Sequence, residues 1–191
     1  MEEQSDKTAE AAAWGIPAGY SIKQWDVRER PIILLGSVFD ANSFGQWTFD
    51  WTVFHWGPGT PMADVAADLW LLLISLSVKT RKVREVVDRR GSTTQQAMVQ
   101  DAVDGADRLW GRLEDIVSEC ESFMWEAAKR RGDGSVAMGK QAGKAFAESM
   151  FGRDRELEET EELMSGIRLW SMRFDANCAD VIRRKEVRRG V

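Results

Sequence analysis

The chain has 191 residues, a formal net charge of −5, 30% charged residues and 43% hydrophobic residues. A chain of this length fits one domain with a sizeable core, and its composition is that of a soluble globular protein. Its acidic balance argues against nucleic acid as a partner, because nucleic-acid binding relies on a basic face that neutralises phosphates.

The compartment and the membrane relationship follow from three local features. The first residues, MEEQSDKTAE, lack the basic stretch and the apolar run of a signal peptide. The longest apolar run, Leu69 to Val78, is about half of the roughly 20 residues that cross a bilayer. Cys120 and Cys178 lie in apolar helical patterns typical of buried thiols, which leaves a disulfide between them open. We expect a cytoplasmic protein without a membrane span.

The N-terminal region predicts a tail followed by one domain. Residues 1–20 are rich in Ala, Glu and Thr and contain Gly15, Pro17 and Gly19 near their end, which predicts a mobile tail. Residues 21–191 are expected to form a single α-helical domain. Within it, the stretch PIILLGSVFDA, residues 31–41, begins with a proline suited to a first helical turn and predicts a short buried helix.

The next segment, SFGQWTFDWTVFHWGPGTP, residues 43–61, concentrates three tryptophans, three phenylalanines and the only histidine. Its alternation suits a half-buried strand paired with IILLGSVF, and a helical wheel of the same residues gives two apolar faces. We favour the helix for residues 44–56, because Ser43 can cap its start and Gly57-Pro58 can end it.

The pattern of the rest of the chain predicts helices. Residues 61–90 follow a Thr60 cap and are apolar on all sides from Leu69 to Ile74, which predicts a central helix covered on more than one side. Periodic apolar positions predict a long helix over residues 92–131, a shorter one over 136–150 and a last one over 157–181. The sum is an all-α antiparallel bundle of about five to six helices with an aromatic-rich N-terminal segment.

The sequence contains few residues and motifs that suit catalysis or metal binding. A single histidine, His55, excludes paired-histidine zinc motifs and di-iron bundles, and no G-x-S-x-G nucleophile motif occurs. Asp101, Asp104 and Asp107 form a row that suits magnesium, but the same spacing is typical of a solvated helix face, which we favour. We therefore expect no metal and no cofactor, and we favour a non-enzymatic protein over an enzyme.

The aromatic segment is the candidate site. The first hypothesis is a non-enzymatic helical protein that acts through protein–protein contacts, with a homo-oligomer as one form of them. The alternative is a carrier or an enzyme that binds a small hydrophobic ligand in an aromatic-lined pocket. Both hypotheses use the same candidate interface or pocket residues, which are Trp47, Trp51, Phe54, His55, Trp56 and Trp70.

Three pieces of sequence, GSVFDANS, DWTVFHWGPGTP and DLWLLL, lie in the run from Glu29 to Trp70. This run, about a fifth of the chain, resembles a segment of a helical protein family of filamentous ascomycete fungi to which no activity is assigned. The resemblance implies a shared domain, and it implies no substrate or catalytic residue.

Overall fold

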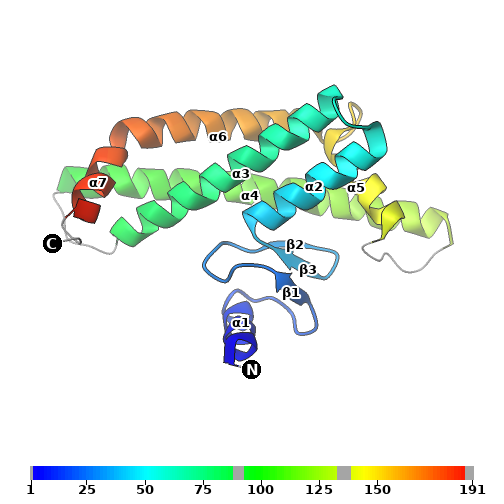
Figure 1. The fold of residues 1–191 in the computed structure, drawn as a ribbon, viewed down its shortest axis with the longest axis horizontal. Helices are drawn as coiled ribbons and strands as arrows, with labels where there is room; N and C mark the ends of the chain where they lie inside the picture. Colours follow the sequence, from blue (N-terminus) through cyan, green and yellow to red (C-terminus); the bar gives the residue numbers. More distant parts are fainter. Residues whose placement is uncertain (1, 88–92, 133–138, 188–191) are drawn as a thin grey trace.

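The computed structural model describes residues 2–87, 93–132 and 139–187. The protein is mostly helical (76%), with seven helices in the described residues and a small three-stranded mixed sheet near the N-terminus (Figure 1). The prediction of a mostly helical protein is confirmed, but the prediction of a purely all-α fold with about five to six helices is wrong. The elements are α1 (Glu2–Ala13), β1 (Ser21–Gln24), β2 (Ile32–Leu34), β3 (Ser37–Phe39), α2 (Ala41–Trp56), α3 (Pro61–Val87), α4 (Thr93–Arg130), α5 (Lys140–Phe151), α6 (Leu157–Asn177) and α7 (Ala179–Val187).

The prediction of a short helix for residues 31–41 is wrong, because these residues form the antiparallel hairpin β2–β3. Ile32 pairs with Phe39 and Leu34 with Ser37, so two residues make the turn. Both turn residues have positive φ, 47° at Leu35 and 72° at Gly36, as a type I′ hairpin turn requires. Leucine rarely adopts this conformation, so the sequence carried only half of the usual turn signal.

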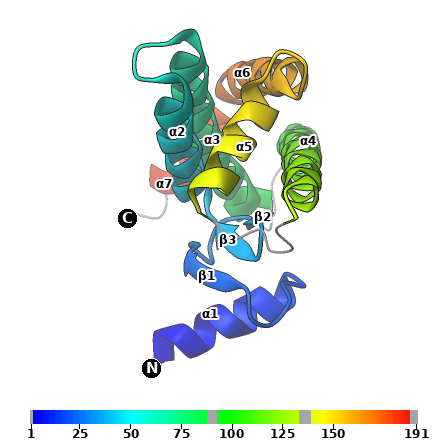
Figure 2. The same cartoon turned by 90° about the vertical axis from the view of Figure 1, so that its right-hand side faces the viewer.

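The N-terminal residues form a small unit on the sheet. Strand β1 pairs in parallel with β3 and gives the strand order β1-β3-β2. Residues 2–13, expected as part of a mobile tail, form α1, which lies on the side of the sheet away from the other helices (Figure 2). A second, small core joins this unit to the sheet through Ala11, Ile16, Trp25 and Val38.

The main bundle is organised around α3. This helix contacts α2, α4, α6 and α7, which confirms its predicted central place. Helices α4 and α6 run side by side along the long axis of the molecule, and α5 lies near one end beside α2 (Figure 1). The last predicted helix is two helices, α6 and α7, which meet at Cys178. The predicted end of α3 beyond Val87 lies outside the described residues.

Both cysteines are buried and free, so no disulfide joins them. Burial raises the pKa of the Cys120 thiol to about 12, and burial also raises the pKa of Cys178. Because the thiolate is the reactive form, both thiols are kept unreactive by the core. The expectation of buried cysteines is confirmed.

Candidate functional site

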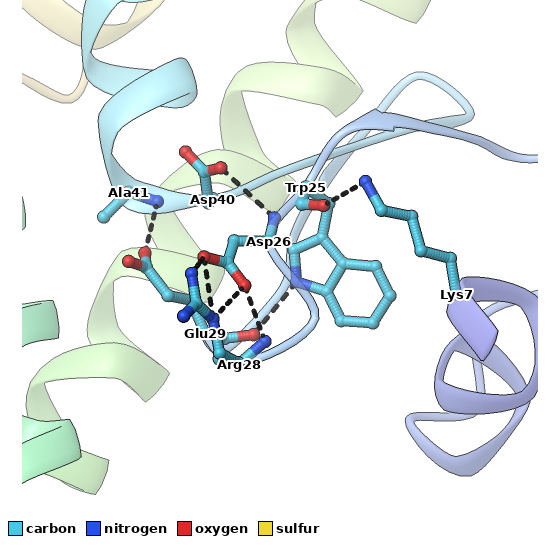
Figure 3. A network of polar contacts seen from close by, with 7 residues as sticks. All are labelled: Lys7, Trp25, Asp26, Arg28, Glu29, Asp40 and Ala41. Atoms are coloured by element: carbon cyan, nitrogen blue, oxygen red, sulfur yellow. Dashed lines mark hydrogen bonds and ion pairs between the residues drawn. The ribbon is translucent and has the colours of Figure 1, made fainter. Parts of the chain in front are cut away.

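The start of the aromatic helix α2 is fixed by a polar network (Figure 3). The Asp40 carboxylate accepts hydrogen bonds from the backbone N–H of Ser43 at 2.7 Å and of Asp26 at 3.2 Å. Glu29 accepts a third from the N–H of Ala41 at 3.3 Å, so the first turn is capped twice. The predicted Ser43 cap is therefore wrong, since α2 begins at Ala41 with Asp40 as its N-cap.

The network also holds its own loop in place. The Arg28 guanidinium lies 2.6 Å from the Asp26 carboxylate, and its hydrogen bonds lower the pKa of that carboxyl group. The Trp25 indole N–H donates to the carbonyl of Glu29 at 2.9 Å. These contacts determine the residue at which α2 begins, and hence the direction in which each aromatic side chain points. We infer a structural role for the network.

One aromatic face of α2 is covered by α5. The rings of Trp47 and Phe146 are edge-to-face with centroids 4.9 Å apart, and Phe146 is fully buried. The Trp51 indole lies directly on Gly143, where an added Cβ would be 2.0 Å from a ring carbon. Only glycine allows this approach of α5 to the Trp51 ring.

The other face of α2 is covered by α3. Trp70 lies against Gly45, where an added Cβ would be 2.3 Å from its ring. The Trp70 ring is 5.9 Å from that of Phe49, and its indole N–H donates to Asn42 at 3.0 Å. The helix chosen for residues 44–56 is thus confirmed, and both of its apolar faces make contacts within the molecule.

The remaining candidates lie toward the end of α2. Phe54 is 52% exposed, and the ammonium groups of Lys140 and Lys144 lie 6.0 and 5.2 Å from its ring centroid. His55 is exposed and edge-to-face with the half-buried Trp56 at 4.3 Å. The six candidates therefore lie together on α2 and the facing part of α3, mostly as packing contacts, and their binding role stays a prediction.

Helix α3 has an apolar surface that is open to solvent and lies outside the aromatic segment. Its outward positions recur at steps of three and four residues and form what we call the α3 stripe. Leu71, in the middle of the stripe, is 67% exposed, and only 33% of the most apolar window of the helix is buried. The predicted coverage of α3 on more than one side is confirmed, but this third side is open. The α3 stripe comprises Asp64, Ala67, Leu71, Ile74, Val78 and Lys82.

By length and composition alone, α3 could cross a membrane, with a mean hydropathy of 1.6 over its apolar window. The core helix of a soluble protein meets the same criterion. The stripe is also charged at both ends, since Asp64 and Lys82 are exposed and neither has an ion-pair partner among the described residues. The absence of a membrane span stays a prediction.

A second open surface is the groove between α4 and α6, the α4–α6 groove. It has a volume of about 310 Å³, an apolar floor and arginines along its sides. None of the six aromatic candidates lines it. Its lining residues are Met98, Asp101, Ala102, Gly105, Arg108, Leu109, Arg112, Gly166, Leu169, Trp170, Arg173, Phe174, Asn177 and Cys178.

The aspartate row on α4 is engaged in structural contacts. Asp107 pairs with Arg84 and, at 3.4 Å, with Arg30, and Asp104 accepts a hydrogen bond from Gln100 at 2.8 Å. Within residues 2–87, 93–132 and 139–187, no group of three or more His, Cys, Asp or Glu side chains is placed to hold a metal ion. Asp107 therefore serves the packing of α4 against α3 and the loop before β2, and the contact of Asp104 stays within α4.

The fold defines a mostly helical protein with a small mixed sheet, and the α3 stripe and the α4–α6 groove are two open surfaces of the part of the chain that the structure describes. Comparison with protein-family models, with curated proteins and with solved structures finds no match. The resemblance of residues 29–70 to a fungal family stays a prediction, and the two surfaces are the features from which a function can be inferred.

Sequence reasoning missed both surfaces, although each left a signal. The stripe has one aspartate at the start of a helical face and one lysine at its end, with apolar residues between them. The groove contains Gly105 and Gly166, and isolated glycines inside amphipathic helices indicate close packing or a functional site.

Proposed function

We propose that the protein acts through protein–protein contacts, and that it associates with a second copy of itself through the α3 stripe. The observation that carries the proposal is the open apolar centre of the stripe, with Leu71 67% exposed. Leu71 lies in a row with the half-buried Ala67, Ile74 and Val78, and an apolar row that charged residues border is typical of an interaction surface.

The charges of the stripe favour a second copy as the partner. A two-fold axis level with Leu73 makes the two α3 helices antiparallel and sets Asp64 of one copy level with Lys82 of the other, since both are nine residues from Leu73. The paired stripes extend over about 27 Å between these two charges. The same operation brings the apolar centres together, so the surface is complementary to itself in both charge and hydrophobicity.

The aromatic segment has a supporting part in this proposal. Trp70 and Phe49 stack beside the stripe and fix α3 against α2. A rigid helix loses little conformational freedom when it binds, which strengthens association. No step of the proposal needs a catalytic group or a cofactor.

Substitution of Leu71 by glutamate tests the proposal. We expect the wild-type protein to show a mass that approaches twice that of one chain as concentration rises in sedimentation equilibrium. The variant should weaken dimerisation by at least about 30-fold, because two leucines lose roughly 1–2 kcal/mol of burial each. Leu71 is already largely exposed in the monomer, so the fold should be kept.

The matched control is Met172→Glu, on α6 outside the stripe, where the side chain is 70% exposed. This variant should dimerise as the wild type does. A wild-type protein that stays monomeric at all concentrations would refute self-association. Binding of a monomer to neutral lipid vesicles that Leu71→Glu abolishes would also contradict it, and would make the stripe a membrane contact.

A further inference from the structure

The floor of the α4–α6 groove is apolar and held in one arrangement. Leu109, Trp170 and Phe174 are each buried to more than nine-tenths, and the rings of Trp170 and Phe174 lie 5.4 Å apart. The Trp170 indole N–H donates to the carbonyl of Ala102 at 2.9 Å, so its polar atom is satisfied within the fold. The surface left to a ligand is therefore hydrocarbon and aromatic carbon.

The sides of the groove carry three arginines, Arg108, Arg112 and Arg173, and one carboxylate, Asp101, so their net charge is positive. Arg112 is held by Glu162 at 3.0 Å and by Glu159 at 3.6 Å. Arg108 and Arg173 are exposed and have no ion-pair or hydrogen-bond partner among the described residues. Two guanidinium groups beside an apolar floor are free to bind an anion, and arginine binds carboxylate and phosphate oxygens in bidentate geometry.

The shape of the groove suits a chain. Its lining residues extend from Met98 to Arg112 on α4 and from Gly166 to Asn177 on α6, with Cys178 directly after α6, a length of about 20 Å at the helical rise. Its volume of about 310 Å³ is at the small end of the range of small-molecule sites. Leu169, on one wall, is 52% exposed and adds apolar surface that a ligand would cover.

We propose that the α4–α6 groove binds a single-chain amphiphile with an anionic head. The alkyl chain lies along the floor over Trp170 and Phe174, and the carboxylate or phosphate head is held by Arg108 and Arg173. Burial of the chain supplies most of the affinity, and the arginines select the charge of the head. This site is separate from the α3 stripe and does not depend on dimerisation.

The test uses four amphiphiles that share the same alkyl chain and differ in their head group. Dodecanoate, dodecyl phosphate, dodecanol and dodecyltrimethylammonium, all below their micelle concentrations, compete with a dansyl-labelled fatty acid followed by fluorescence anisotropy. We expect at least one of the two anions to compete, with dodecanol about tenfold weaker and the ammonium weaker still. The anion that binds more tightly shows whether the site prefers a carboxylate or a phosphate head group.

The variant Arg108→Gln/Arg173→Gln should bind the two anions about tenfold or more less tightly than the wild type, and its affinity for dodecanol should be unchanged. Both arginines are exposed, so circular dichroism should show unchanged helix content. Arg153→Gln, an exposed arginine between α5 and α6, is the matched control and should bind as the wild type does. Leu71→Glu should also bind dodecanoate normally, which separates this site from the proposed dimer.

Three results would overturn the proposal. In the first, no probe binds the wild-type protein. In the second, dodecanol competes as strongly as dodecanoate, so that the arginines select nothing. In the third, the double arginine variant retains full affinity for the anions.

Discussion

Gly143→Ala is expected to lower the free energy of unfolding by about 1–3 kcal/mol or more, as overpacking of a well-filled core does. The added Cβ would lie 2.0 Å from the Trp51 ring, closer than any real contact allows. Either the indole or α5 must move, and α5 also carries Phe146, which packs between Phe44 and Trp47. The measurement is urea denaturation followed by circular dichroism, with the midpoint and slope compared with those of the wild type.

The matched control for this variant is Gly111→Ala, also in a helix interior. Nothing lies within 4 Å of a Cβ at Gly111, so this change should raise stability by up to about 1 kcal/mol. The cause is tested by the double variant Gly143→Ala/Trp51→Leu, which should be more stable than the sum of its single changes predicts, by about 0.5–3 kcal/mol. Additive effects would show that the Trp51 contact does not control the packing of α5.

The aromatic helix shows how far sequence reasoning reached. Its helical state followed from the context and from the stop at Gly57, and the structure confirms it. Its first residue did not follow from the sequence, because Asp40 and Ser43 are both good caps. Asp40 is the cap because it also contacts Asp26 in the loop after β1. A residue-level pattern cannot choose between two caps when tertiary contacts decide.

The coverage of the aromatic residues could not be predicted for a similar reason. Trp51 is covered because Gly143 lets α5 approach it, and these two residues are far apart in the sequence. The periodicity of α2 shows two apolar faces without showing which helix lies on each. The hairpin β2–β3 was missed because Leu35 takes a backbone conformation that leucine seldom adopts.

The open face of α3 was also not predicted from the sequence. The sequence showed a helix that is apolar on all sides, and from this we expected coverage by neighbouring helices. The structure places α2 on one side and α4 and α6 on another, and leaves the Leu71 side open. Which side stays open depends on the lengths and crossing positions of the neighbouring helices, and these are not encoded in α3 itself.

The second large effect is expected from exchanging the charges of the α3 stripe. Asp64→Lys sets two lysines level with each other at both ends of the proposed dimer, and Lys82→Asp sets two aspartates level there. Each variant alone should dimerise about tenfold less well than the wild type at low ionic strength, because like charges replace opposite ones. Both residues are exposed, so neither change should affect the fold.

A mixture of these two variants tests the account most directly. Asp64→Lys and Lys82→Asp chains, one of them isotope-labelled, are combined at equal concentration and their dimers are separated by native mass spectrometry. Self-association through antiparallel α3 stripes predicts that the mixed dimer dominates, since opposite charges then meet at both ends. A statistical mixture of dimers, or dimerisation of each variant as tight as that of the wild type, would contradict the α3 stripe as the interface.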